Sequence, residues 1–527
     1  RERGVITEEW RLGRGAAARL RDKQFPVLLK NSRYAERLPI GKVDIIKNFE
    51  HETLRKFYRD WYRPELMAVI AVGDFDKAAI EELVKKHFGN IPASVNPKER
   101  KYFEVPDHKE VLYSLATDPE ETGTSVEVYY KMKLQPEVTI NDYKARITEL
   151  VYNRMLSQRL KELSLLPDPP FVLASSSKGQ FVRTKEFYYL AAMVKDDGVK
   201  RGLESVLTEA ERVKKYGFTA TELERTKTEL LRYIEKSYTE RDKSPSKKYA
   251  DEYIRHFLTG EPAPGIEYEF DLQKQIIPQI TLDEVNALAG KWMTKENNVV
   301  MVSGPEKEGV SLPTEKELAE VFEQVKSKEI EPYVDKSSQE PLVKNVPAPV
   351  KIDSEKKIPE LNITEWKLSN GVKVVVKPTE FKNDEVLLRA YSPGGNSLIP
   401  DSEYIPVTTA GLLVNQSGVG GFNNVELTKK LAGKVVSVQP YISQNTEGVL
   451  GSASPKDLET MFQLIYLYFK EPRIDSTSFL SYQAKVKTIV GNREKDPEAA
   501  YNDTLSLTLS QYNFRSYPWT LSTIEKM

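Results

Sequence analysis

The sequence repeats one pattern at two places, and this repeat limits the architecture more than any other feature. Residues 49–74 read FEHETLRKFYRDWYRPELMAVIAVGD, and residues 280–305 read ITLDEVNALAGKWMTKENNVVMVSGP. When the two segments are aligned, Trp61 meets Trp292, which lies 231 residues further along the chain. Self-similarity at a fixed spacing is typical of a chain built from repeated structural units. Because a single core stops growing near about 250–300 residues, we expect this 527-residue chain to contain several related domains.

Each copy has the pattern of a helix followed by a buried strand. The apolar residues at helical spacing are Phe49, Leu54, Phe57 and Trp61 in the first copy and Leu282, Val285, Leu288 and Trp292 in the second. This spacing predicts an amphipathic helix with one buried apolar face in each copy. A short polar turn then leads to an apolar run, which predicts strands at residues 67–72 and 299–302. Thr281 and Glu284 match a capping box at the start of the second helix.

A third unit follows a segment without periodicity. Residues 331–358 are rich in proline, serine and lysine, as is typical of an interdomain linker. Residues 366–376 read WKLSNGVKVVV, and the Asn-Gly pair between two apolar runs predicts a β-hairpin. We therefore divide the chain into residues 1–103, the C-terminal part of a first domain, residues 104–330, a second domain, and residues 359–527, the N-terminal part of a third.

The composition argues against several classes of function. The chain has 77 basic and 78 acidic residues and a net charge of -1, so no general affinity for nucleic acid or anionic membranes is expected. No apolar run reaches the roughly 18 residues that a membrane-spanning helix needs, so we expect no membrane span. The absence of cysteine excludes disulfides, thiolate metal sites and a cysteine nucleophile.

Short motifs along the chain resemble the pitrilysin/insulinase family of zinc peptidases, peptidase family M16. They are ERGVITEE at residues 2–9, RLPIG at 37–41, FYRDWYRP at 57–64, VGDF at 72–75 and LSNG at 368–371. The resemblance implies an α+β fold of repeated two-layer α/β domains of the LuxS/pitrilysin-like type, with mostly antiparallel sheets packed by helices and about 230 residues per repeat. It also implies four such domains in two halves that close around a peptide.

The resemblance implies a zinc site whose residues this sequence carries only in part. Family members bind zinc through both histidines of an HxxEH helix and a glutamate seventy-odd residues later, and the glutamate within HxxEH activates the water. The four histidines are His51, His87, His108 and His256. No two of them have the HxxEH spacing. We therefore expect HxxEH to lie upstream of residue 1, no catalytic residue within this chain, and no peptide hydrolysis by the chain alone.

Two acids in the first segment are candidates for the zinc site of the intact parent protein. The resemblance places Glu9 at the third zinc ligand and Glu2 as a supporting acid beyond the ligands. Seven residues are about two helical turns, so these two side chains share one helix face while Glu8 points about 100° away. A solvated, charged helix face is the alternative interpretation. In this fragment we expect Glu9 to bind Zn²⁺ weakly or not at all.

The corresponding positions in the other domains lack metal ligands. In the third domain the resemblance places Gly411, Val414 and Asn415 where an active domain has the first His, the Glu and the second His. In the second domain Glu224-Arg225 resembles Glu2-Arg3, and the same alignment puts Leu231 opposite Glu9. We expect these domains to shape a chamber and bind peptide without cutting it.

The upstream location of HxxEH has a structural consequence. If the first domain lacks its opening strands, its residual sheet is incomplete. We therefore expect this residual sheet and the helix that contains Trp61 to expose apolar surface.

Two functions remain open after these comparisons of motifs. The intact parent is either a zinc metalloendopeptidase for peptides or short unfolded polypeptides, or a non-catalytic partner or scaffold subunit of the same family. A homodimer and a complex with a second M16 subunit both fit. The resemblance favours the bacterial periplasm or cell envelope, although the composition leaves the compartment open.

Overall fold

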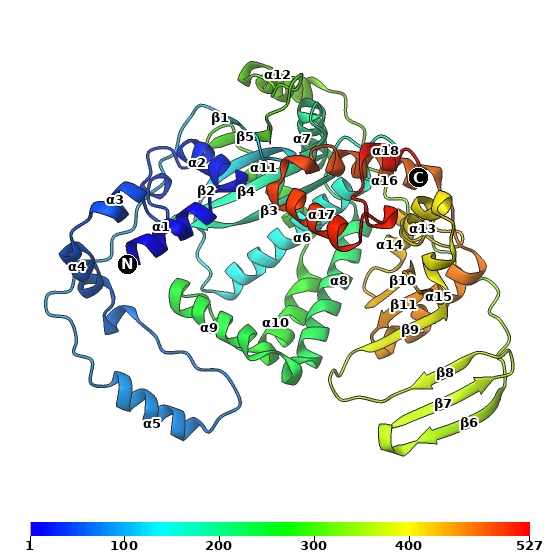
Figure 1. Cartoon of the computed structure of the whole chain (residues 1–527). Helices are drawn as coiled ribbons and strands as arrows, with labels where there is room; N and C mark the ends of the chain where they lie inside the picture. Colours follow the sequence, from blue (N-terminus) through cyan, green and yellow to red (C-terminus); the bar gives the residue numbers. More distant parts are fainter. Residues whose placement is uncertain (1) are drawn as a thin grey trace.

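We describe a computed structural model of the chain, which places residues 2–527. In Figure 1 the chain forms an arch. The N-terminal helices lie at one end, a five-stranded sheet with its helices lies in the middle, and two three-stranded sheets lie at the other end.

The N-terminal region, residues 2–103, is helical. Its helices are α1 (Glu2–Leu12), α2 (Ala16–Leu28), α3 (Val43–Asn48), α4 (His51–Trp61) and α5 (Lys77–Phe88). Helix α2 packs on the central sheet through the buried Leu28, which joins a cluster with Leu112 and Phe187. Helices α3 to α5 lead away from the sheet (Figure 1). The first region is therefore attached to the rest mainly through α2.

The central region has one mixed sheet. Its strands are β1 (Leu112–Asp118), β2 (Thr124–Lys133), β3 (Leu173–Val182), β4 (Lys185–Val194) and β5 (Asn298–Pro305). Their order is β1-β5-β2-β4-β3; β1 runs parallel to β5, and the other neighbours are antiparallel. The helices are α6 (Ile140–Leu163), α7 (Val199–Tyr216), α8 (Ala220–Thr239), α9 (Ser246–Thr259), α10 (Ile266–Gln279), α11 (Leu282–Trp292) and α12 (Glu315–Ser327).

The main core lies between this sheet and the helices. Every second residue of β2 is buried, as at Val126, Val128 and Tyr130, because alternate side chains of a strand point to the same face. They pack against buried side chains of α6 and α7, such as Val151 and Leu203. The sheet and its helices thus form the two-layer unit that the sequence predicts.

The C-terminal region has two separate sheets. One contains β6 (Ile352–Ile358), β7 (Ile363–Leu368) and β8 (Lys373–Val376) in that order, and the other has the order β10-β11-β9. The strands of the second are β9 (Val386–Pro393), β10 (Val436–Ile442) and β11 (Thr446–Ala453). The helices are α13 (Tyr404–Gln416), α14 (Asn424–Lys430), α15 (Leu458–Lys470), α16 (Ser476–Val490), α17 (Pro497–Leu509) and α18 (Leu521–Ile524).

The predicted fold class is confirmed. The sheets are mostly antiparallel and helices pack on them, as in an α+β protein. The predicted hairpin at residues 366–376 is also confirmed as β7 and β8, with Gly371 at a φ of +90° in the turn, a conformation that glycine adopts without strain. Among the helices of residues 2–527, none has the length and apolar character needed to cross a membrane.

Two expectations from the sequence are wrong. Residues 67–72 are not a strand, whereas 299–302 form part of β5. A strand needs a neighbour for its backbone hydrogen bonds; β5 has β1 and β2, and residues 67–72 pair with no strand in the part of the chain that the structure describes. In addition, the end of the predicted linker, from Ile352, is strand β6, because the edge of β7 offers it a partner.

Candidate functional site

Helix α1 holds both acids for which the sequence suggests a role at zinc. The side chains of Glu2 and Glu9 are exposed. Glu8, the neighbour of Glu9, forms an ion pair with Arg11 at 2.8 Å. Within residues 2–527, no side chain lies within ion-pair or hydrogen-bond distance of the Glu9 carboxylate. The two adjacent glutamates therefore differ: Glu8 is paired with Arg11, and the Glu9 carboxylate has no protein partner among the described residues.

Arg3 fixes the position of this helix. Its guanidinium donates hydrogen bonds to the carbonyl oxygens of Lys47 and Phe49, the second at 2.5 Å, and lies 4.6 Å from the centroid of the Phe49 ring. These contacts tie α1 to the segment that precedes α4. The orientation of Glu9 thus depends on an arginine six residues, or about 1.7 turns, earlier in the same helix.

The residues of this chain do not fit a complete zinc site. A zinc site in a hydrolase needs three protein ligands, and no group of three His, Cys, Asp or Glu side chains among residues 2–527 could hold a metal. Two of the histidines are engaged elsewhere, since Nδ1 of His108 lies 2.6 Å from the Glu110 carbonyl oxygen and Nδ1 of His256 lies 2.6 Å from that of Glu261. Glu9 contributes one ligand at most.

The three positions on α13 that replace HxxEH serve packing. A Cβ atom at Gly411 would lie 3.1 Å from the Pro440 carbonyl oxygen, so the absence of a side chain lets α13 approach β10 closely. Val414 packs against the core of this region. The Asn415 amide donates to the Val438 carbonyl oxygen at 3.1 Å and to the Tyr468 hydroxyl at 3.0 Å. That these residues descend from an HxxEH motif remains a prediction.

Helix α8 carries Glu224-Arg225, the pair that resembles Glu2-Arg3 of α1. Leu231, the residue opposite Glu9, packs on the hydrophobic core. Arg225, the residue opposite Arg3, binds both carboxylate oxygens of Asp335 at 3.0 and 3.2 Å. Each of the two arginines therefore anchors a later segment, and the position at which the resemblance predicts a metal ligand holds a carboxylate in α1 and a leucine in α8.

Asp335 belongs to a charged network that joins the central and C-terminal regions. Lys429 of α14 lies 2.9 Å from Asp335 and 2.9 Å from Glu162 of α6. The Tyr333 hydroxyl donates to Glu162 at 2.8 Å. Burial alone would raise the pKa of Asp335, but the hydrogen bonds from Arg225, Thr221 and Lys429 outweigh it and bring the pKa to about 2.

Sequence reasoning missed this network because a polar, proline-rich segment usually indicates a linker. The signal lies at its start, where the tyrosine at 333 and the acid at 335 stand apart from the Ser- and Lys-rich remainder. The side chain of Asp335 is only 4% exposed, and that of Lys429 is 2% exposed. The first residues of the linker are therefore part of a structured contact between the central and C-terminal regions. We call this contact the joint; its charged network consists of Glu162, Arg225, Tyr333, Asp335 and Lys429.

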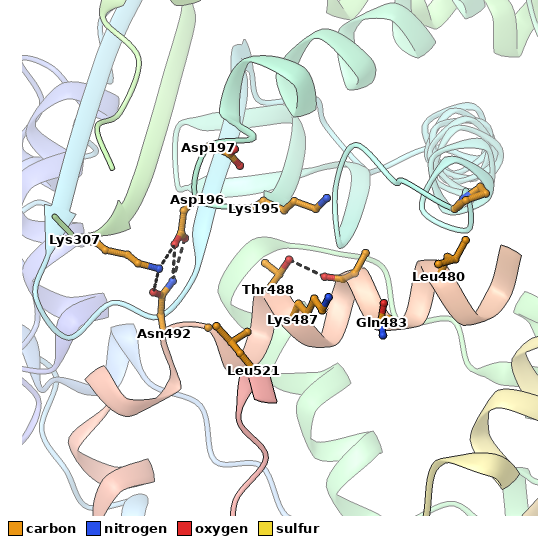
Figure 2. A pocket seen from close by; sticks show the side chains of 13 residues that line it. Lys195, Asp196, Asp197, Lys307, Leu480, Gln483, Lys487, Thr488, Asn492 and Leu521 are labelled. Carbon is orange, nitrogen blue, oxygen red and sulfur yellow. Dashed lines mark hydrogen bonds and ion pairs between the residues drawn. The ribbon is translucent and has the colours of Figure 1, made fainter. Parts of the chain in front are cut away.

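A cavity of about 510 Å³ lies along the same joint (Figure 2). It is bounded by the loop after β4, by Lys307 and by α16. Asn492 donates to both carboxylate oxygens of Asp196, at 3.0 and 3.1 Å, and Lys307 lies 3.1 Å from the same carboxylate. Figure 2 shows these three residues bonded at one end and Lys487 and Gln483 on α16. The joint is thus held together by polar contacts at two separate places.

Comparisons with known proteins show similarity to zinc proteases and to a domain of the M16 peptidase family. Residues 48–230 match the family model described as "Peptidase M16 inactive domain". The chain is 31% identical over 505 residues to a "Zinc protease PQQL-like" protein of Arabidopsis thaliana, an alignment that covers 95% of this chain and 47% of the relative. It is 25% identical over 499 residues to the "Probable zinc protease PqqL" of Escherichia coli, with 92% and 52% covered. The chain spans about half the length of these relatives.

Two solved structures share the fold over the whole chain. The periplasmic protease PqqL from Escherichia coli superposes with a TM-score of 0.59 at 20% identity, with 58% of that chain covered. The ferredoxin protease FusC, solved in complex with Arabidopsis ferredoxin, gives a TM-score of 0.65, also at 20% identity and 58% coverage. Sequence motifs, curated relatives and fold agree, and the chain belongs to the M16 (pitrilysin/insulinase) family of peptidases, with PqqL-like proteins among its relatives.

Proposed function

We propose that this chain is part of a zinc-dependent metalloendopeptidase in which Glu9 is the third zinc ligand. The observation that supports this is the contrast on α1, where Glu8 is paired with Arg11 and Glu9 is exposed without a partner among the described residues. The curated relatives are zinc proteases or probable ones. An unpaired carboxylate at this position suits a ligand that completes a site with two histidines from another segment.

The chain's own residues would position one zinc ligand, and the HxxEH residues that the chemistry requires are not in this sequence. Arg3 fixes α1, and Glu9 and Glu2 lie on the same helix face, where Glu2 supports the ligand from beyond the metal. Zinc, when bound in the intact parent, acidifies a water for attack on a peptide bond. The central and C-terminal domains form part of the chamber that holds a peptide or a short unfolded polypeptide.

The test begins with the coding sequence before Arg1, where HxxEH is expected seventy-odd residues before Glu9. In the longer protein, Glu9→Gln should lower zinc affinity by more than about 10–100-fold, since that is the typical loss when only a group beyond the ligands is disturbed, and abolish cleavage of a quenched fluorescent peptide. Glu8→Gln is the matched control, since Glu8 is committed to Arg11. Zinc content by mass spectrometry and cleavage rate are the two readouts. Equal zinc content in both variants would contradict the proposed role of Glu9.

The second candidate is a non-catalytic partner or scaffold subunit that binds peptide or an active M16 subunit. Two observations favour it: the matching family model describes an inactive domain, and Gly411 and Asn415 serve packing in the third domain. An upstream sequence without HxxEH supports this candidate. Co-purification from the native source would then identify the active partner or a homodimer.

For the compartment we propose the periplasm or cell envelope of a bacterium. One solved relative is described as periplasmic, although a relative with 31% identity comes from a plant. Fractionation followed by immunodetection of the intact parent tests this, and a signal exclusively in the cytosolic or organelle fraction would refute it.

A further inference from the structure

A second cavity lies between α6 and α8, close to the charged joint. Its volume is about 330 Å³. Residues of α6 and α8 form its walls, and Tyr333, Thr428 and Lys429 close one end. Because α14 and the linker contribute, this joint cavity exists only while the central and C-terminal regions are docked. Figure 1 shows α6 and α8 on the side of the arch that faces α14.

Polar side chains line both walls at helical spacing. The α6 wall carries Arg154, Gln158 and Lys161, and the α8 wall carries Glu222, Thr226 and Glu229. Residues at i, i+4 and i+7 lie on one face of a helix, so two polar stripes face each other. Packed helices usually meet through apolar stripes.

The charges on these walls are only partly matched. Glu222 is bound by Arg159 at 2.7 Å, and Lys429 is bound by Asp335. Arg154, Lys161 and Glu229, in contrast, have no oppositely charged group within 4.0 Å in residues 2–527. Burial raises the pKa of Glu229, and Arg154, Arg225 and Lys161 offset the effect only from a distance. Charged groups that line a cavity without pairing must be met by water or by a polar ligand.

We propose that the joint cavity binds the C-terminal residue of a short peptide. Two unmatched cations face one unmatched carboxylate, so the ligand must bring a net negative charge together with a hydrogen-bond donor. A peptide C-terminus has both. The Arg154 guanidinium, with its planar fork of donors, and the Lys161 ammonium bind the α-carboxylate, while Glu229 accepts a hydrogen bond from the last backbone N–H. The volume lies at the lower end of ligand pockets, about 300–1,000 Å³, and so fits a chain end better than a long segment.

This inference rests on the proposed function only for the nature of the ligand. Hydrolysis leaves products with new C-terminal carboxylates, which are the groups that the cavity recognises. Binding itself requires neither zinc nor HxxEH. A failure of the Glu9 experiment therefore leaves the binding test unaffected, and the reverse holds as well.

The test is isothermal titration calorimetry on the full chain with N-acetyl-alanyl-alanine and with its C-terminal amide. We expect the acid to bind at least about tenfold more tightly than the amide, because the amide lacks the negative charge that the two cations bind. A tenfold ratio corresponds to about 1.4 kcal/mol. Arg154→Met and Lys161→Met should each remove most of this preference. Lys316→Met, on the exposed face of α12, is the matched control and should leave it unchanged.

Three results would overturn the proposal. Equal affinity for acid and amide would remove the basis for carboxylate recognition. Inorganic phosphate that competes as strongly as the peptide acid would make the cavity a general anion site. An unchanged preference in Lys161→Met, which keeps its fold because Lys161 is exposed, would show that binding occurs elsewhere.

Discussion

Helices α4 and α11 come from the two copies of one sequence pattern, yet their surroundings are opposite. In α11, Trp292 is 4% exposed and its ring lies 4.9 Å from those of Tyr152 and Tyr188. In α4, the apolar face is open, with Leu54 58% and Phe57 54% exposed. The expectation that the helix of the first copy exposes apolar surface is thus confirmed, whereas the residual sheet expected beside it does not form within residues 2–103. The pattern specifies an amphipathic helix, but burial depends on a sheet contributed by other parts of the chain.

The segments after the two helices show the same contrast. Residues 299–302 form part of β5 and pair on both sides, with β1 and β2. Residues 67–72 have a similar apolar sequence but form no ladder. A strand is defined by its neighbours, so two equivalent sequences differ when only one finds partners.

The largest expected difference between the two copies concerns their tryptophans. Trp292→Ala should lower the free energy of unfolding by about 3–5 kcal/mol, because it empties space among tightly packed aromatic rings. Trp61→Ala should cost less, about 1–2 kcal/mol, since Trp61 is only partly buried and its ring meets the Lys98 ammonium, 5.6 Å away, where Trp292 meets a packed core. Urea titrations followed by circular dichroism measure both. Equal losses would mean that α4 packs in solution against a partner surface, and the comparison would then break down.

The next effect concerns Arg3 of α1 and Arg225 of α8, which the motif comparison aligns with each other. Asp335→Asn removes the carboxylate that Arg225 and Lys429 share, and breaking a buried ion pair costs about 3 kcal/mol. Arg3→Met removes hydrogen bonds to two carbonyl oxygens at a half-exposed position and should cost about 1 kcal/mol. Asp353→Asn, an exposed acid on β6, is the control for the first substitution.

The Asp335 carboxylate makes the stability contributed by its ion pairs depend on pH. The pKa of Asp335 is about 2 in the folded chain, below the value of about 3.9 for an unfolded aspartate. Its contribution is therefore fully present above about pH 4 and is lost as the pH falls toward 2. Urea titrations at a series of pH values should show this loss in the unaltered chain and a smaller one in Asp335→Asn. Parallel pH curves would exclude Asp335 as the titrating group.

The sequence carried the local features of the fold because they depend on neighbours along the chain. The helices at Trp61 and Trp292, the capping box at Thr281 and the hairpin at residues 366–376 all follow from spacing within a few residues. The sequence did not predict which strands pair when they lie far apart along the chain. The missing strand at residues 67–72 depends on partners outside the segment.

The candidate site shows the same division between local and long-range information. Glu9 was identified from a motif within one helix, and its availability beside the paired Glu8 became visible only in three dimensions. The joint around Asp335 brings together side chains up to 267 residues apart, from Glu162 to Lys429. No periodicity within the chain links residues so far apart, so only the structure reveals this network.

The smallest expected effect concerns the helix starts. The Thr281 hydroxyl accepts from the Glu284 backbone N–H at 3.2 Å, and the Glu284 carboxylate accepts from the Thr281 N–H at 2.8 Å. In α4 the N-cap residue is Glu50, which makes no side-chain capping bond. Thr281→Ala should therefore cost about 1 kcal/mol, and Glu50→Ala should change the free energy of unfolding by about 0.5 kcal/mol or less. Urea titration measures both.

A double substitution separates capping from packing as the cause of the difference between the copies. Glu50→Thr with Thr53→Glu gives α4 the residues of a capping box, as in α11. If packing dominates, amide exchange in α4 should slow by no more than about tenfold, because one cap contributes about 1 kcal/mol, and α4 should still exchange faster than α11. Exchange as slow as in α11 would instead assign the difference to the cap. The exposed apolar face of α4 would then reflect a stable free helix, with no need for a sheet to hold it.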